Sequence, residues 1–155
     1  MQTRTSFERI LNAPAETVYH LISDYAEHHR AAPQGFLPDA FTDLVVERGG
    51  VGEGTAIRFT SKLGGRSQTV SATISEPQPG RVLVESSPGL VTTFTVEPVD
   101  ARRSRVRFDT VVEAGGLMGL ITRLVVPGML RPVYAAEMAR LEHHAQAHPA
   151  LPAVA

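Results

Sequence analysis

The side chains best suited to chemistry gather at two places in the sequence. The first is Asp24-Tyr25 with His28 and His29, which follows a short amphipathic stretch. A histidine tuned by a neighbouring carboxylate can move a proton near neutral pH, so these residues form a candidate acid–base site, with Tyr134 as a partner from a distant element. The alternative is structural: Asp24 ends a helix, Tyr25 packs with its hydroxyl at a rim, and both histidines face water.

The second place is the histidine-rich C-terminal segment, which contains His143-His144 and His148. His144 and His148 are four residues apart and share a helical face, a spacing that can hold a metal ion. No carboxylate completes the set, and the adjacent His28-His29 side chains diverge on a helix or strand. No metal and no cofactor are therefore expected, and the histidines are expected to be solvated. The absence of cysteine excludes disulfides and thiolate chemistry.

Two other motifs do not support the functions that they first suggest. The glycine-rich run GGVGEG, residues 49–54, lacks a following Lys-Ser/Thr pair and leads into a predicted strand, so it indicates a hairpin turn and no phosphate loop. Arg103, Arg105 and Arg107 form a basic stripe. Stacking aromatic residues are missing between them and Asp109 is close in sequence, so cross-strand ion pairs are expected and nucleic-acid contacts are not.

Composition is that of one soluble globular domain. The chain has 155 residues, of which 43% are hydrophobic and 20% charged, with a net charge of −1. One domain over residues 1–148 is expected, with a loose Ala/Pro tail at 149–155. The first residues alternate polar and apolar and do not form a secretory signal, so a cytoplasmic location is predicted.

One apolar segment, Leu117–Ala136, resembles a membrane span in length. It contains Arg123, Arg131 and two prolines. Each arginine near a bilayer centre costs roughly 2.5–3.5 kcal/mol, so a buried helix is expected and stable membrane insertion is not.

The chain in order predicts a strand, a short helix and a run of strands. Thr3–Leu11 alternates as a strand does, and a helix is expected to begin near Pro14 and end near Tyr25. Six short strands joined by tight turns follow: Asp43–Glu47, Thr55–Leu63, Ser67–Glu76, Arg81–Ser86, Leu90–Glu97 and Ser104–Glu113. Short turns between consecutive strands indicate an antiparallel meander.

Alternation within these strands predicts which side chains face the core. The expected inward set is Ile57, Phe59, Val70, Ala72, Ile74, Val82, Val84, Phe94, Val96, Val106, Phe108 and Val112. Ser61, Ser86 and Thr110 are its few expected polar members. Such an apolar face favours ligand binding over catalysis.

The segment Gly115–His148 is expected to be a long helix packed on this sheet. Its first half has one apolar face: Leu117, Leu120, Ile121, Leu124 and Val125. Its second half has another, displaced by very roughly 100°: Tyr134, Met138 and Leu141. A straight helix cannot keep both faces on one sheet, so a kink is predicted between Pro127 and Pro132, with a ligand cavity between helix and sheet.

The expected ligand-binding residues come from the loop, the sheet and the long helix. They are Phe36, Leu37, Phe41, Ile57, Phe59, Val70, Ala72, Phe94, Phe108, Ile121, Val125, Met129 and Tyr134. The loop Ala26–Thr42 holds three large apolar residues, which indicates either a mobile lid or a packed loop that closes one end of the core.

The order of elements resembles the helix-grip fold of the START/Bet v 1-like superfamily, and most closely its polyketide cyclase/dehydrase-type branch (SRPBCC). The matching residues are Ala13-Pro14-Ala15-Glu16-Thr17-Val18, Ile22-Ser23-Asp24-Tyr25, Gly52-Glu53-Gly54-Thr55 and the ending Leu117–Leu141. The resemblance covers residues 2–147. It implies an α+β fold in which a curved antiparallel sheet of about seven strands wraps around a long kinked C-terminal helix, with one or two short helices after the first strand.

The resemblance also implies a deep cavity that holds lipids, sterols, polyketides, plant hormones or quinones. Binding of a lipophilic small molecule, by a monomer or homodimer, is the first hypothesis. A polyketide cyclase, aromatase or dehydratase is the second hypothesis, and it requires an arginine, aspartate or histidine that points into the cavity. Arg58, Arg105 and Asp109 are expected to lie on the outer face of the sheet, outside the cavity. The third is an interaction protein that docks through an exposed loop bearing Phe36, Leu37 and Phe41.

Overall fold

The computed structural model describes residues 2–31 and 34–147 and contains seven strands, two α-helices and a 3-10 turn. The elements are β1 (Gln2–Leu11), α1 (Ala15–Ser23), β2 (Phe41–Arg48), β3 (Ala56–Ser61), the 3-10 turn Leu63–Gly65, β4 (Gln68–Gln78), β5 (Val82–Ser87), β6 (Leu90–Pro98), β7 (Ser104–Glu113) and α2 (Gly116–Ala147). The predicted strands and helices all occur. The predicted tail 149–155 lies outside the described residues.

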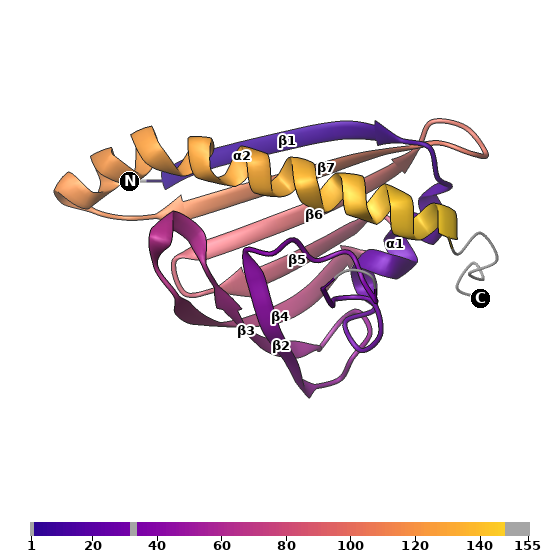
Figure 1. The fold of residues 1–155 in the computed structure, drawn as a ribbon, viewed down its shortest axis with the longest axis horizontal. Coiled ribbons are helices and arrows are strands. Elements are labelled where there is room, and N and C mark those ends of the chain that lie inside the picture. Colours follow the sequence, from indigo (N-terminus) through magenta and orange to yellow (C-terminus); the bar gives the residue numbers. More distant parts are fainter. Residues whose placement is uncertain (1, 32–33, 148–155) are drawn as a thin grey trace.

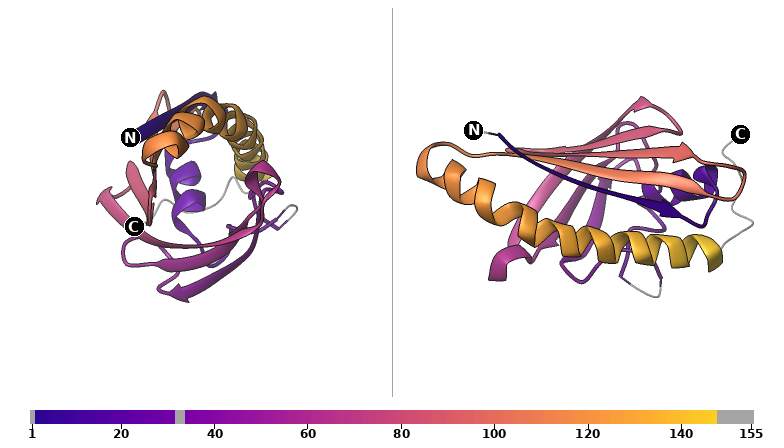
Figure 2. Two further views of the ribbon diagram at one scale, coloured as in Figure 1. Left: turned by 90° about the vertical axis from the view of Figure 1, so that its left-hand side faces the viewer. Right: turned by 90° about the horizontal axis from the view of Figure 1, so that it is seen from above.

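The seven strands form one antiparallel sheet in the order β1-β7-β6-β5-β4-β3-β2. Strands β2 to β7 follow one another as a meander, and β1 adds to the outer edge of β7, as Figure 1 shows. The sheet curves beneath α2, which crosses it as one continuous but bent helix (Figure 2). This arrangement confirms the predicted helix-grip fold.

The C-terminal half of α2 holds the helix on the sheet. Its buried stripe recurs every three or four residues, which places all its members on one helical face. The stripe consists of Leu130, Tyr134, Met138, Leu141 and Ala145, each at most 5% exposed. The second apolar face predicted from sequence therefore packs as expected.

The first half of α2 does not pack as predicted. Ile121, Leu124 and Val125 are 43%, 75% and 47% exposed, and the helix is continuous through Pro127 and Pro132. The N-terminal end of α2 extends past the ends of the strands, so its apolar face has no sheet to cover (Figure 2). The predicted packing of both faces on the sheet is therefore wrong, whereas α2 does bend along its length, as Figure 2 shows. The side chains of Leu117 and Leu120 lie outside the described part.

The loop between α1 and β2 is a packed wall of the core. Phe36 and Leu37 are 1% and 5% exposed, and the Arg140 guanidinium of α2 donates a hydrogen bond to the Leu37 carbonyl at 2.7 Å. Gly35 permits this packing, because a Cβ there would lie 2.2 Å from the His28 carbonyl oxygen. The proposed exposed docking loop is thus contradicted, since its apolar side chains point into the protein.

The glycine-rich turn 49–54 joins the end of α1 to the sheet. The Gly50 carbonyl accepts hydrogen bonds from the backbone N–H groups of Tyr25 (2.8 Å) and Ala26 (3.1 Å). The N–H groups of Gly52 and Gly54 donate to the carbonyls of Ser23 and Ile74. These donors are therefore engaged within the protein, which agrees with a structural turn.

Two of the three arginines of the basic stripe on the outer face are ion-paired within their own hairpin. Arg107 pairs with Asp109 at 2.8 Å, and Arg103 pairs with Asp100 at 2.9 Å. These partners lie on the same strand and in the adjoining turn, whereas cross-strand pairs were expected. Across the described residues, no helix is both long and apolar enough to span a membrane.

The two halves of α2 should differ in what they contribute to stability. Met138→Ala leaves a cavity beneath the helix and should lower the free energy of unfolding by about 2–5 kcal/mol. Leu124→Ala, the matched control in the exposed half, should change it by less than about 0.5 kcal/mol. Chemical denaturation measures both values. Equal losses would show that the first half of α2 is also packed in solution.

Candidate functional site

An apolar cavity of about 110 Å³ lies between the concave face of the sheet and the C-terminal half of α2. Its wall is formed by strands β2 to β6, the loop before β2 and one face of α2. The lining residues are His29, Leu37, Phe41, Leu44, Ile57, Phe59, Ser61, Leu63, Gln68, Val70, Glu85, Leu90, Thr92, Phe94, Leu130, Tyr134 and Glu137. Gln68 is exposed, so the cavity approaches the surface at the β3–β4 hairpin.

Strand β5 brings a carboxyl group into this wall, contrary to the sequence prediction. Leu83 is fully buried and pairs with the inward Phe94, and Glu85 pairs with the inward Thr92. Val82 and Val84, predicted to face inward, therefore point to the other face, as does Ser86. Val82, Leu83 and Val84 are all apolar, so the sequence of β5 does not indicate which alternate set faces the core. The pairing of β5 with β6 decides it.

The Glu85 carboxyl is held by a tyrosine. The Tyr25 hydroxyl donates a hydrogen bond to Glu85 Oε1 at 2.5 Å. Burial raises the pKa of Glu85 to about 7, although the bond from Tyr25 favours the charged form and opposes this effect. Glu85 retains some accessible surface because it lines the cavity, while protein atoms around it still exclude bulk water.

The second carboxyl group comes from α2. Glu137 is 5% exposed and lines the cavity. Within the part of the chain that the structure describes, its carboxyl has no hydrogen-bond or ion-pair partner. Burial, and secondarily the nearby negative charge of Glu85, raise the pKa of Glu137 to about 8. At neutral pH Glu137 is therefore mostly a neutral acid that can donate a hydrogen bond to a guest molecule.

A chain of hydroxyl groups continues the polar part of the wall. Thr92 and Thr110 face each other across β6 and β7 at 2.9 Å, and Thr110 is hydrogen-bonded to the Tyr134 hydroxyl. Burial raises the pKa of Tyr134 to about 12, so the phenol stays protonated. Thr110 was predicted to face inward and does so.

His29 completes the polar set. Its Nε2 lies 2.6 Å from the Ile22 carbonyl oxygen, so Nε2 carries the proton and donates it there. The ring stacks on Tyr25 with centroids 3.8 Å apart. Burial lowers the pKa of His29 to about 3, so the imidazole is neutral and its other nitrogen, Nδ1, keeps its lone pair. The expected solvent exposure is wrong for His29 and also for His144, which is 6% exposed.

The structure divides the predicted acid–base cluster into two groups. Tyr25, His29 and Tyr134 belong to the cavity side, whereas Asp24 and His28 lie together with His20. His148 falls outside the described residues.

Seven of the thirteen predicted ligand-binding residues line the cavity: Leu37, Phe41, Ile57, Phe59, Val70, Phe94 and Tyr134. Phe36, Ala72 and Phe108 are buried in the core. Phe108 supports the cavity from behind, with its ring 4.8 Å from Phe94 and 5.4 Å from Tyr134.

The three predicted residues on the first part of α2 lie elsewhere. Ile121 and Val125 are largely exposed, because that part of the helix extends beyond the sheet. Met129 packs against the 3-10 turn, where its Sδ lies 3.1 Å from the position that a Cβ on Gly64 would occupy. Gly64 has a φ of +65° and leaves space for the thioether, so this contact helps to hold the turn against α2.

Sequence reasoning missed Glu85 and Glu137, yet one of them carries a readable signal. Glu137 lies three residues after Tyr134 and precedes Met138, so it belongs to the apolar stripe that the helical period defines. Burial of an acidic side chain on such a stripe costs free energy, so its presence there indicates a functional role. Glu85 had no comparable signal, because the strand phase was ambiguous.

Solved structures share this fold. The KanY protein, solved in solution, superposes with a TM-score of 0.74 at 26% identity, covering 94% of this chain and 99% of its own. The Zhui aromatase/cyclase from Streptomyces sp. R1128 has a TM-score of 0.73 at 14% identity, with 96% of each chain covered. A START superfamily protein from Mycobacterium smegmatis has a TM-score of 0.67 at 16% identity, covering 93% of this chain and 97% of its own.

The protein thus has the helix-grip fold, with an apolar cavity between the sheet and the long helix. Residues 2–146 match the family described as polyketide cyclase / dehydrase and lipid transport, and the chain belongs to that family. No curated protein matches its sequence.

The two buried carboxyl groups should make stability fall as the pH rises. A glutamate in the unfolded chain has a pKa of 4.5, below the folded values of about 7 and about 8. Between pH 4.5 and these folded pKa values the folded chain therefore binds more protons than the unfolded chain. The stabilisation by protonation is complete only below pH 4.5 and is lost as the pH rises through the folded pKa values. From about pH 5 to about pH 9 the free energy of unfolding should decrease, by up to about 1.4 kcal/mol per pH unit for each group that ionises only on unfolding.

Glu137→Gln should make this pH dependence shallower, because the amide has no proton to lose. Urea denaturation at several pH values measures the slope, and Glu97→Gln on the exposed end of β6 is the matched control, expected to keep it. A slope unchanged in Glu137→Gln would show that Glu137 titrates normally in the folded chain.

Proposed function

We propose that this protein binds a small lipophilic molecule that carries a carbonyl or hydroxyl oxygen. The observation that supports this proposal is an apolar cavity with the carboxyl group of Glu137 in its wall, for which the described residues provide no hydrogen-bond partner. Aromatic and aliphatic side chains, such as Phe59 and Val70, take up the apolar part of a ligand. Protonated Glu137 is a hydrogen-bond donor for its oxygen.

The size of the cavity limits the ligand. At about 110 Å³ it is close to an engineered cavity of roughly 150 Å³ that binds benzene, and smaller than the roughly 300–1,000 Å³ of drug-sized sites. One ring fits within this volume, and a second ring would extend toward the surface at the β3–β4 hairpin, where the exposed Gln68 lines the cavity. A sterol or a long polyketide would require α2 or the 3-10 turn to move outward.

Simple energetics give a moderate affinity. About 250 Å² of buried apolar ligand surface contributes about 6 kcal/mol at 25 cal/mol per Å². A micromolar Kd corresponds to about 8 kcal/mol, so one or two hydrogen bonds to the polar wall must supply the remainder. The polar wall therefore selects among ligands of similar size.

The comparisons support a lipophilic ligand. The family description names polyketide cyclases, dehydrases and lipid transport, and the Zhui protein is described as an aromatase/cyclase. Such ligands combine apolar skeletons with carbonyl oxygens, which are the two features that the cavity wall can accommodate.

Acid–base conversion of the bound molecule is a second candidate, favoured by the pKa values of Glu85 and Glu137. At about 7 and about 8 they leave one carboxylate and one carboxylic acid in the same cavity near neutral pH. Glu137 can give its proton to a substrate carbonyl oxygen while the Glu85 carboxylate removes a proton from the adjacent carbon. The product is an enol, the common first step of cyclisation by carbon–carbon bond formation and of dehydration.

Filling the cavity should abolish binding. The chain contains no tryptophan, so Val70→Trp introduces an indole into the wall and a single fluorophore at the same time. With 2-naphthol as probe, isothermal titration calorimetry should show that Val70→Trp binds at least about tenfold more weakly than the wild type, which corresponds to about 1.4 kcal/mol of binding free energy. Val45→Trp on the exposed side of β2 is the control and should bind as the wild type does. Equal binding by all three proteins would place the ligand outside this cavity.

Proton transfer can be tested separately from binding. With 1-tetralone in D2O, NMR should show faster deuterium exchange at the carbon beside the carbonyl when the protein is present. Glu137→Gln keeps a hydrogen-bond donor, so it should retain binding but lose about 100-fold in exchange rate, as should Glu85→Gln. Binding of 1-tetralone without faster exchange by the wild type would reject this second candidate and leave the first intact.

A further inference from the structure

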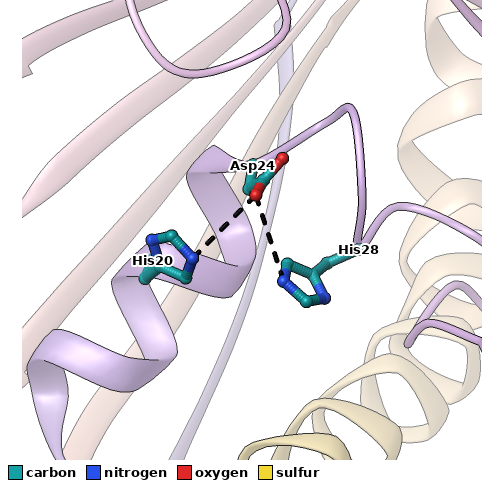
Figure 3. A group of neighbouring side chains, drawn as sticks. All are labelled: His20, Asp24 and His28. Atoms are coloured by element: carbon teal, nitrogen blue, oxygen red, sulfur yellow. Dashed lines mark ion pairs between the residues drawn. The ribbon is translucent and has the colours of Figure 1, made fainter. Parts of the chain in front are cut away.

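Three metal-ligating side chains converge where α1 ends, away from the cavity wall. His20, Asp24 and His28 are spaced four residues apart, and their ligand atoms all lie within 4.8 Å of one another. Asp24 Oδ2 is 3.9 Å from His20 Nε2 and 4.0 Å from His28 Nε2. Figure 3 shows the carboxylate between the two imidazole rings, one on the helix and one in the following loop.

The backbone around Asp24 fixes its carboxylate in this position. Helix α1 ends at Ser23, and Asp24 leaves the helical conformation with φ −93° and ψ 88°. Asp24 Oδ1 then accepts hydrogen bonds from the N–H groups of Ala26 and Glu27, each at 3.1 Å. Oδ2 is therefore the oxygen that faces the histidines.

A fourth residue orients one of the rings from α2. His28 Nδ1 lies 3.1 Å from Nε2 of the buried His144. When Nδ1–H donates to His144, the lone pair of His28 is at Nε2, the atom that faces Asp24. Metal-ligating histidines in proteins are oriented by just such a hydrogen bond to their second nitrogen.

Charge balance also favours a cation at this place. Asp24 is 7% exposed, and in the described part of the chain its ionic partners are His20 and His28, with no lysine or arginine among them. Neutral imidazoles leave a largely buried carboxylate without a compensating charge, which is energetically costly. A divalent cation bound by two neutral imidazoles and the carboxylate removes this cost.

The distances are close to those that zinc requires. Zinc–ligand bonds of about 2.0–2.2 Å in tetrahedral geometry place neighbouring ligand atoms about 3.3 Å apart. Each Nε2–Oδ2 distance must therefore shorten by about 0.6–0.7 Å, and the distance between the two histidine nitrogens, which is within 4.8 Å, by at most about 1.5 Å. The His20, Asp24 and His28 side chains are 19%, 10% and 13% exposed, which leaves a path for the ion. Two nitrogens and one oxygen leave a fourth position for water or another ligand.

We propose that His20, Asp24 and His28 form a binding site for one divalent transition-metal ion of the zinc type, with His144 as the residue that positions His28. The ion would fasten the end of α1 to the loop that carries His29 to the cavity wall. This proposal does not depend on the ligand or the reaction assigned to the cavity.

Titration of untagged, chelator-treated protein with Zn²⁺ tests the proposal. We expect one ion per chain, and with Co²⁺ an intense visible absorption typical of tetrahedral coordination. Two single variants remove a ligand: Asp24→Asn, which keeps the size of the side chain, and His20→Ala. Each should weaken Zn²⁺ binding at least about 100-fold. His144→Ala should weaken it about 10–100-fold, because it removes only the positioning bond.

The exposed His143 provides the matched control, and His143→Ala should bind Zn²⁺ as the wild type does. Circular dichroism establishes that each variant is folded before titration. Stoichiometric binding that survives both Asp24→Asn and His20→Ala would place the ion elsewhere and overturn the proposal. Absence of binding to the folded wild type would also overturn it.

Discussion

The packing of the C-terminal half of α2 into the curved sheet is the contact on which the rest of the structure depends. Tyr134, Met138 and Leu141 occupy the concave face and leave an apolar space beside them. Burial of this stripe also carries Glu137 into a region from which water is excluded. The same hydrophobic contact that stabilises the fold therefore sets the protonation state of the group most able to interact with a guest molecule.

Strand pairing supplies the second half of the site. Because Glu85 pairs with Thr92, and Thr92 with Thr110, the polar side chains form a short row across the sheet that ends at Tyr134. Apolar residues surround this row, and burial raises the pKa values of its two titratable groups, Glu85 and Tyr134. A guest molecule thus meets an apolar space with one hydrogen-bonding edge.

Much of the fold follows from sequence, because its signals are local. Short alternating strands and tight turns predicted the meander, and helical spacing located Met138 and Leu141 in the core. The site was harder to predict. The inward phase of β5 is set by its neighbour β6, which no local pattern reveals, and the exposure of Ile121 depends on where the sheet ends. Likewise, the approach of His144 to His28 joins residues 116 positions apart.

The uneven burial of α2 has a kinetic consequence. The free energy needed to open this helix rises along its length, from an exposed beginning near Ile121 to a fully buried Leu141. Amide hydrogens should therefore exchange rapidly at one end and slowly at the other. Met129, at the boundary between the two regimes, rests on the turn beside the cavity. The change from rapid to slow exchange along α2 therefore falls where the helix begins to cover the cavity.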